Sequence, residues 1–306
     1  MTTPNEALLA EVTGDVTRLY DRHMQSPRLW YPHEQIDWGS GESFTQRAWA
    51  ESDYELSAGV RSAILVNLLT EDGLPYFTSV LLRNAPKGHP LLEWDYQWTM
   101  EENRHAMTMR DWVHVSRCID PVLLEDGRRV QLQSGVAPNL NTFSDLICYV
   151  TLQERATQIA HRNTGSHLNK DDKMGRTVLG LLAGDETKHF FFYRDLSLAA
   201  FKVNPSLMMQ AAARQAKDFD MPGTAIPGFV RHAVRISNEG IYGLSQYTNE
   251  VLRPVLEYWD IEHMEGLDAA GELAREELLE TMRGLAAGVA RSAERSARRS
   301  LVRDTA

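Results

Sequence analysis

Two short motifs, Glu102-x-x-His105 and Glu186-x-x-His189, each place a carboxylate three residues before an imidazole. Residues three apart share one face of an α-helix, so each motif presents both groups in the same direction. Two such pairs on separate helices can meet at a common point. They would supply most of the ligands of a dinuclear iron or manganese site inside a helix bundle.

The remaining ligands of such a site should be one glutamate from each of two further helices. Glu71 precedes Glu102 by 31 residues, and Glu154 precedes Glu186 by 32 residues. About 30 residues suit an antiparallel helix pair with a short connection. The sequence therefore indicates an internal pseudo-repeat that brings six ligands together. The alternative for either motif alone is a solvated charge pair on a helix surface.

Two further polar residues follow Glu154 on the same predicted helix face. His161 lies two turns later, and because six ligands already fill the site we interpret it as a hydrogen-bonded core histidine. Thr157 lies one turn later, and its hydroxyl could simply bond to a backbone carbonyl of its own helix.

Composition limits the class of protein. The chain has 306 residues and a net charge of −10, which argues against general nucleic-acid or membrane-surface binding. Its two cysteines, Cys118 and Cys148, suggest no disulfide framework and fit a reducing compartment. We find no signal-peptide pattern and no apolar run of membrane-spanning length. A cytoplasmic protein without membrane insertion is expected.

Hydrophobic periodicity predicts an all-α fold in one domain, residues 1–306. An N-terminal helix and loop span residues 5–46, with Trp38 as a packing anchor in the loop. A core bundle spans about 49–197, with a mixed stretch at 118–140, and further helices occupy 198–301. The four ligand helices are expected at 49–82, 91–117, 141–164 and 171–197. Pro75 cannot donate to the carbonyl of Glu71, which predicts a distorted helix there.

Four segments resemble motifs of one known family, the soluble acyl-(acyl carrier protein) desaturases of plants and their actinobacterial relatives. The segments are Thr70-Glu71-Asp72-Gly73-Leu74-Pro75, Trp98-Thr99-Met100-Glu101-Glu102-Asn103-Arg104-His105, Gln153-Glu154-Arg155-Ala156-Thr157 and Asp185-Glu186-Thr187-Lys188-His189. The resemblance covers about residues 30 to 200. It implies a ferritin-like four-helix bundle with additional flanking helices.

The resemblance also implies roles for individual residues. Glu102 and Glu186 would bridge two iron ions, for which manganese could substitute. Glu71 with His105 would complete one site, and Glu154 with His189 the other.

Outside the ligands, the resemblance implies a carboxylate partner for each imidazole, one electron relay and one proton relay. Asp185 would hold His105, Glu101 would occupy the matching position in the other half, Trp30 would relay electrons through Asp185 and His105, and Thr157 would hand protons to an oxygen intermediate.

The implied activity is O2-dependent insertion of a cis double bond into a saturated acyl chain. The chain would arrive on an acyl carrier protein, electrons would come from a ferredoxin-like donor, and the enzyme would be a homodimer. Four apolar residues are candidates for the substrate channel, although apolar residues at helical spacing are often simple core: Val80, Phe143, Ile147 and Val150.

Two other activities remain open, and each predicts a different product. One is a related di-iron hydroxylase that acts on a carrier-tethered substrate. The other is a ferritin-like iron-binding protein or iron oxidase, which would need no electron donor. The arginine-rich end of the chain, Arg291 to Arg303, is either a solvated helix end or a patch for an acidic partner.

Overall fold

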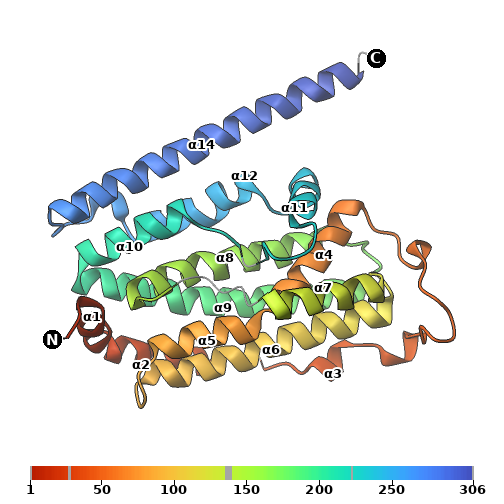
Figure 1. The fold of residues 1–306 in the computed structure, drawn as a ribbon, viewed down its shortest axis with the longest axis horizontal. Coiled ribbons are helices and arrows are strands. Elements are labelled where there is room, and N and C mark those ends of the chain that lie inside the picture. The colour runs from red at the N-terminus through yellow and green to blue at the C-terminus, as the bar shows by residue number, and fades with distance from the viewer. Residues whose placement is uncertain (1, 27–28, 135–139, 222, 305–306) are drawn as a thin grey trace.

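A bundle of long helices forms the centre of the molecule (Figure 1). The computed structural model describes residues 2–26, 29–134, 140–221 and 223–304, and within these ranges it contains helices and no strands. The prediction of an all-α bundle is therefore confirmed. The bundle consists of α4 (Ala58–Glu71) continued by α5 (Leu74–Asn84), α6 (Pro90–Ser116), α8 (Phe143–His167) and α9 (Lys173–Val203).

The first ligand helix is shorter than the predicted helix 49–82. It begins only at Ala58, because the Ser57 hydroxyl caps its first turn by accepting a hydrogen bond from Val60 N at 3.1 Å. Residues 49–57 instead contain the short turn η2 (Glu51–Asp53). The distortion expected near Pro75 is present: α4 ends at Glu71 and α5 begins at Leu74. Glu71 therefore occupies the last position of its helix.

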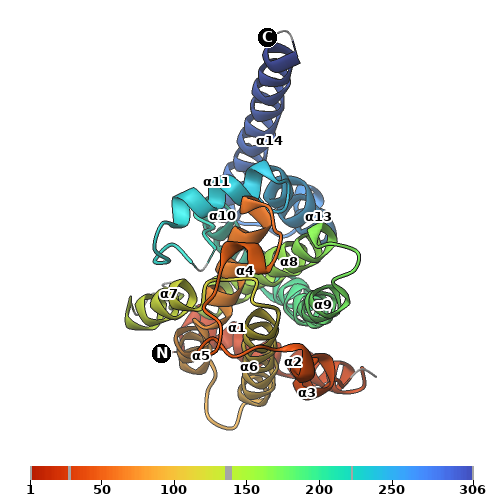
Figure 2. The ribbon, with the colours of Figure 1, turned by 90° about the vertical axis from the view of Figure 1, so that its right-hand side faces the viewer.

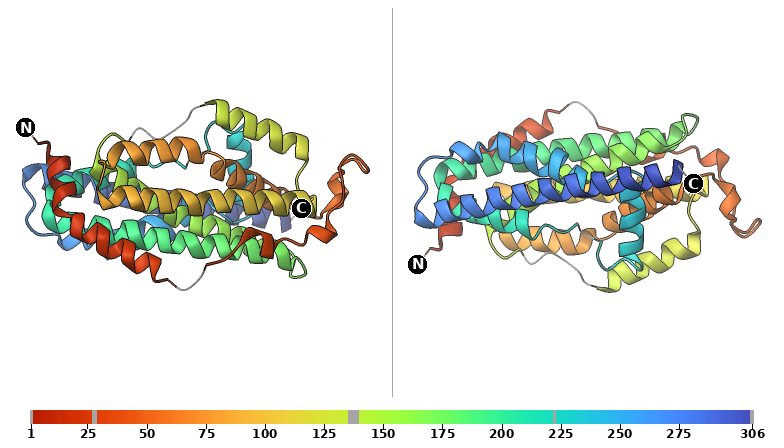
Figure 3. Two further views of the ribbon diagram at one scale, coloured as in Figure 1. Left: turned by 90° about the horizontal axis from the view of Figure 1, so that it is seen from below. Right: turned by 90° about the horizontal axis from the view of Figure 1, so that it is seen from above.

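The N-terminal segment packs along the bundle. Its predicted single helix is divided into α1 (Pro4–Glu11) and α2 (Thr13–Met24), and α2 lies beside α9 (Figure 3, left). The following loop contains α3 (Pro32–Gln35) and the turn η1 (Trp38–Ser40). The prediction that Trp38 anchors this loop is wrong, because Trp38 is 54% exposed. Trp30, which is 4% exposed, is the buried tryptophan of the loop.

The mixed stretch predicted at 118–140 contains a helix, α7 (Pro121–Ser134), while residues 135–139 lie outside the described ranges. The pair Asp126-Gly127 lies within this helix, although Asp-Gly pairs are common in turns. Gly127 packs closely against α4 there, since a Cβ atom would lie 2.8 Å from Leu69 Cδ1 and the Leu69 side chain would have to move. A close helix contact therefore explains a glycine that resembles a turn signal.

The C-terminal third covers one side of the bundle. It comprises α10 (Pro205–Lys217), α11 (Phe229–Asn238), α12 (Leu244–Gln246), a π-helical turn η3 (Tyr247–Leu252), α13 (Arg253–Tyr258), η4 (Ile261–His263) and α14 (Ala269–Asp304). The helices predicted at 198–301 are present, but residues 228–259 are divided among several short helical segments. The end of α14 rises away from the rest of the molecule (Figure 2). No helix within the described ranges is both long and apolar enough to cross a membrane.

Arg117 ties the loop before α4 to the end of α6. It adopts a left-handed conformation with φ 57°, and its side chain is 5% exposed. The guanidinium donates to Asp53 at 2.8 Å and to three backbone carbonyls, those of Glu42, Arg47 and Ala48, at 3.1, 3.0 and 2.9 Å. One buried side chain therefore holds a long irregular segment against the bundle.

Replacing Arg117 should destabilise the fold. We expect Arg117→Ala to lower the free energy of unfolding by about 1–3 kcal/mol, because three backbone carbonyls lose their donor and Asp53 keeps only Arg47 as an ion-pair partner. Chemical denaturation followed by circular dichroism measures the change. The control Arg117→Lys keeps the charge and should lose less. A loss below about 1 kcal/mol in Arg117→Ala, which is typical of an exposed ion pair, would contradict the assignment.

Candidate metal centre

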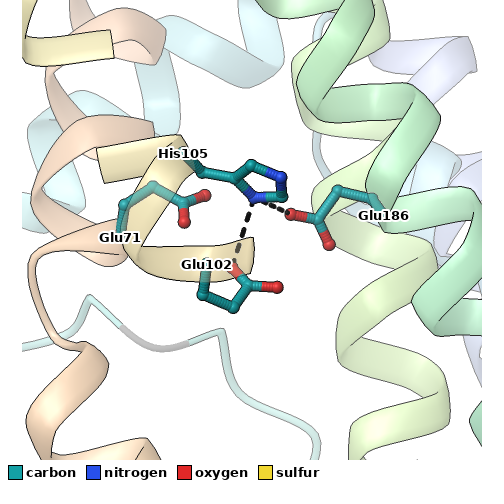
Figure 4. A group of neighbouring side chains, drawn as sticks. All are labelled: Glu71, Glu102, His105 and Glu186. Carbon is teal, nitrogen blue, oxygen red and sulfur yellow. Dashed lines mark ion pairs between the residues drawn. The ribbon is translucent and has the colours of Figure 1, made fainter. Parts of the chain in front are cut away.

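The structure brings the six predicted ligands together inside the bundle. None of them is more than 7% exposed. They form two overlapping groups whose ligand atoms lie within 4.8 Å of one another. The first group is Glu71, Glu102, His105 and Glu186, and their side chains point toward one another in Figure 4. The second group is Glu102, Glu154, Glu186 and His189. The two shared residues are Glu102 and Glu186.

The imidazoles face this cluster through their Nδ1 atoms. His105 Nδ1 lies 3.4 Å from Glu102 Oε2 and 3.3 Å from Glu186 Oε1. His189 Nδ1 lies 2.9 Å from Glu102 Oε1 and 3.5 Å from Glu154 Oε2. Both Nδ1 atoms are nevertheless buried without a hydrogen bond of good geometry to any described residue. The donor atoms thus converge on common points more than they pair with each other, and imidazole with carboxylate is a ligand set suited to iron or manganese.

A second carboxylate holds the far side of each imidazole. His105 Nε2 lies 3.3 Å from Asp185 Oδ2, and His189 Nε2 lies 2.7 Å from Glu101 Oε2. When Nε2 carries the proton and donates it to the carboxylate, Nδ1 keeps its lone pair for a metal. The contacts predicted for Asp185 with His105 and for Glu101 in the other half are therefore present in the structure. Each of these carboxylates directly precedes a glutamate of the cluster in the sequence.

Asp185 connects the first half of the site to the buried loop tryptophan. Trp30 Nε1 donates to Asp185 Oδ2 at 2.8 Å, and the Trp30 ring lies parallel to that of His105 at 6.4 Å between centroids. Arg104 also donates to Asp185 Oδ2, at 2.5 Å, and its guanidinium covers the Trp30 ring at 4.3 Å. The tryptophan contact was predicted, whereas the role of Arg104 was missed.

Glu101 has different outer partners, which sequence reasoning also missed. His23 Nε2 lies 3.0 Å from Glu101 Oε1, and Gln97 donates to the same oxygen at 2.6 Å. Gln97 could have been found, since it precedes Glu101 by one helical turn. His23 comes from α2, and no spacing rule relates that helix to α6. In both halves of the site a carboxylate contacts the far side of the imidazole, but the next residue in contact is Trp30 in one half and His23 in the other.

Three other side chains fix carboxylate oxygens of the cluster. Thr157 donates to Glu186 Oε2 at 2.8 Å and also approaches the carbonyls of Gln153 and Glu154 in its own helix, at 3.2 and 3.1 Å. The expected bond to its own helix is therefore present, and its role in proton transfer stays a prediction. His161 Nε2 lies 3.0 Å from Glu71 Oε1, as expected of a hydrogen-bonded core histidine. Trp98 Nε1 donates to Glu154 Oε1 at 2.8 Å.

The cluster concentrates charge in a buried place. Burial, with the nearby Glu102 and Glu186 carboxylates, raises the pKa of Glu71 well above its usual range. Burial and Glu186 do the same to the pKa of Glu154. Burial alone would lower the pKa of His105, but the Glu102 charge and the Asp185 hydrogen bond raise it. These opposing shifts are what a cationic ligand would relieve, because it would neutralise carboxylates that burial cannot solvate.

A cavity of about 260 Å³ adjoins the cluster. Its lining includes Glu71, which belongs to the cluster, together with Thr157 and His161, and Phe229 and Tyr242 of the C-terminal region also line its wall. The predicted channel residues behave differently. Val80, Phe143, Ile147 and Val150 are at most 3% exposed within the hydrophobic core, and none of them lines this cavity.

Asp95 is a buried carboxylate two turns before Glu102 on α6. It is 1% exposed, and neither of its oxygens has a hydrogen-bond partner among the described residues. Burial raises its pKa from the ordinary 3.8 to about 8. The neighbouring Tyr193 hydroxyl is also buried and unpartnered within the same ranges. Sequence reasoning missed both, because each falls at an ordinary core position.

Comparison with known proteins assigns the family. A family model described as fatty acid desaturase matches residues 5–305. The chain belongs to the fatty acid desaturase family. It is 34% identical over 282 residues to the acyl-[acyl-carrier-protein] desaturase DesA1 of Mycobacterium tuberculosis, which covers 89% of this chain and 83% of DesA1. The family that the four sequence motifs suggested is thereby confirmed.

More distant relatives agree with this assignment. The stearoyl-[acyl-carrier-protein] 9-desaturase of Solanum commersonii is 28% identical over 69% of this chain and 57% of its own length. The crystal structure of the acyl-carrier-protein desaturase DesA2 of Mycobacterium tuberculosis superposes with a TM-score of 0.70 over 85% of this chain and 97% of that chain, at 22% identity. The latter likeness establishes the shared fold.

Because Glu102 and Glu186 belong to both ligand groups, single substitutions can test which residues bind metal. We expect the reconstituted protein to bind two iron ions per chain, Glu71→Ala to bind one, and Glu102→Ala to bind none, because Glu102 belongs to both groups. Elemental analysis after desalting measures the stoichiometry. The exposed neighbour Glu93 provides the control Glu93→Ala, which should bind both ions. Full loading of folded Glu102→Ala would overturn the ligand set.

The buried Asp95 should make stability depend on pH. Its carboxyl is neutral in the fold below pH 8 but ionised in the unfolded chain above pH 4, so its contribution to stability falls between these values by about 1.4 kcal/mol per pH unit. Asp95→Asn should therefore be close to wild type in stability at pH 4.5 and more stable at pH 7.5. Urea denaturation at both values measures this difference. If the stability difference between Asp95→Asn and wild type were the same at both pH values, the raised pKa of Asp95 would be contradicted.

Proposed function

We propose that this protein is a di-iron acyl-[acyl-carrier-protein] desaturase that uses O2 to introduce a cis double bond into a saturated acyl chain. The observation that carries the proposal is a buried six-ligand cluster that adjoins a mainly apolar cavity. Relatives named as acyl-[acyl-carrier-protein] desaturases support the substrate class.

The ligand assignment follows the two overlapping groups. Glu71 and His105 would complete one iron site, Glu154 and His189 the other, and Glu102 and Glu186 would bridge them. Bound iron, or manganese as a substitute, would supply the O2 activation and C–H cleavage that no amino-acid side chain can perform.

The side chains of the protein orient the substrate and manage protons. The apolar walls around Phe229 and Met221 suit an acyl chain and would exclude water from the cluster. Thr157 lines this cavity while its hydroxyl holds Glu186, so it is placed to carry a proton between the cavity and the metal ligands. We keep Val80, Phe143, Ile147 and Val150 as candidates for the far end of the acyl chain, beyond the metal centre from this cavity.

Electrons would enter through the buried loop tryptophan. Trp30, Asp185 and His105 form a continuous line of contacts that ends at a proposed iron ligand. We infer a ferredoxin-like donor, since one-electron delivery suits this route.

Arginines beside the cavity favour an acidic carrier. Helix α11 lines the cavity through Phe229 and Ala233, and its neighbouring residues Arg231 and Arg235 are exposed. This local positive charge would attract an acidic acyl carrier protein although the whole chain carries −10. We further infer a single domain that works in the cytoplasm as a homodimer.

Product analysis tests the function directly. A panel of acyl-[acyl-carrier-protein] substrates is incubated with the iron-loaded enzyme, ferredoxin, ferredoxin reductase and O2, and the acyl products are analysed by mass spectrometry. We expect a product that has lost two hydrogens, in wild type and Glu93→Ala but not in Glu102→Ala. Addition of one oxygen atom would indicate a hydroxylase instead. Iron oxidation without any acyl product, and without need of the donor, would indicate a ferritin-like protein.

A further inference from the structure

Two tyrosines line the cavity beside the metal centre, and they differ in their hydrogen bonding. Tyr247 donates its hydroxyl proton to Ala216 O at 3.0 Å. The Tyr242 hydroxyl is buried and has no hydrogen-bond partner among the residues that the structure describes. Buried hydroxyls are normally hydrogen-bonded, because a buried group without a partner costs free energy. Tyr242 is therefore a polar group that the described part of the chain does not satisfy.

The other polar side chains of the cavity wall offer no comparable free group. Five of them have interaction partners within the chain, and the sixth is exposed to water: Asn67, Thr70, Glu71, Thr157 and His161, and then Asp220. The rest of the lining is apolar. A ligand that fills this cavity would therefore meet an unsatisfied buried hydroxyl at Tyr242.

The backbone around Tyr242 holds its ring in place. The chain leaves α11 through Gly240, which has a left-handed φ of 76°, and Ile241 N donates to Ile236 O at 3.2 Å. The segment then lies over α8 (Figure 1), where Ile241 O accepts a hydrogen bond from Asn163 Nδ2 at 2.8 Å. The Tyr242 ring also packs against two hydrophobic clusters of the core. A hydroxyl fixed in this way is preorganised for a ligand.

The chemistry of this hydroxyl limits what it can bind. Burial raises the pKa of Tyr242 above its ordinary value of 10.0, so the hydroxyl keeps its proton and acts as a hydrogen-bond donor. Its ligand must therefore bring an acceptor. An alkyl chain has none, whereas the thioester that joins an acyl chain to its carrier has a carbonyl oxygen.

The position of Tyr242 in the wall also fits the thioester end of a substrate. Tyr242 follows α11, whose Phe229 and Ala233 line the same cavity. The exposed Arg231 and Arg235 of that helix are the residues that we propose attract the carrier protein. The thioester is the part of the acyl group closest to its carrier, so we expect it on this side of the cavity.

We propose that the Tyr242 hydroxyl donates a hydrogen bond to the thioester carbonyl of the acyl substrate and so determines which carbons reach the metal centre. This inference rests on the proposed function. A chain anchored at its carbonyl has a fixed number of carbons between the anchor and the cluster. Tyr242 is thus a specificity-determining residue for the position of the double bond.

Binding of two ligands to the full-length, metal-free protein tests the contact. The ligands are stearoyl-[acyl-carrier-protein] and its thioether analogue, in which a methylene group replaces the carbonyl. Wild type should bind the thioester roughly tenfold more tightly than the thioether, and Tyr242→Phe should bind both equally. Isothermal titration calorimetry measures the affinities. The matched control Tyr247→Phe should keep the tenfold difference, because the Tyr247 hydroxyl is already bonded to Ala216 O.

The outcomes separate this inference from the proposed function. If wild type binds both ligands equally, or if Tyr242→Phe keeps the preference for the thioester, the contact is refuted although acyl binding stands. If wild type binds neither ligand, the proposed function fails and this inference fails with it. Thermal denaturation followed by circular dichroism checks the fold: Tyr242→Phe should melt no lower than wild type, and Tyr247→Phe should melt lower because it loses a hydrogen bond.

The double-bond position gives a second readout. With iron-loaded enzyme, Tyr242→Phe should distribute the double bond over neighbouring positions of the acyl chain, because the chain has lost its anchor. Tyr247→Phe should retain the wild-type position. Mass spectrometry of the products locates the double bond. A single, unchanged position in Tyr242→Phe would contradict the role of Tyr242 in setting it.

Discussion

The need to bury four carboxylates and two imidazoles at one point governs this structure. Burial penalises ionised carboxylates, and the pKa of both Glu71 and Glu154 is raised accordingly. Such a cluster is tolerable only if many groups hold it and a cation can compensate its charge. The surroundings follow from this requirement. Carboxylate oxygens receive hydrogen bonds from Trp98 and Thr157, and the imidazoles are held from behind by Asp185 and Glu101.

The two halves of the centre are alike near the ligands and different further out. On one side, Asp185 contacts His105 and accepts a hydrogen bond from Trp30, the buried tryptophan of the loop after α2. On the other side, the His189 partner Glu101 leads to His23 of the N-terminal helix. The cavity reaches the cluster at Glu71 and Thr157. The fold thus keeps the cavity proposed for the acyl chain separate from the Trp30 route proposed for electrons.

Short-range chemistry in the sequence predicted the centre well. Glu-x-x-His on one helix face is a local pattern, and Pro75 acts on the carbonyl of its own helix, so the six converging residues and the break after Glu71 were both accessible. Contacts that depend on tertiary packing were not. The sequence around Gly127 does not reveal that its neighbour is Leu69 of another helix, and Trp38, predicted to anchor the loop by packing, is exposed whereas Trp30 is buried. The cavity walls from the C-terminal third lay beyond any motif.

The proposed activity depends on two iron ions that Glu102 and Glu186 would join into one centre. Mössbauer spectroscopy of the protein reconstituted with ⁵⁷Fe measures this most directly. If both residues bridge the ions, nearly all iron in the oxidised protein should belong to antiferromagnetically coupled ferric pairs with a diamagnetic ground state. Iron that behaves as magnetically isolated high-spin ferric ions, in protein shown to be folded, would contradict it.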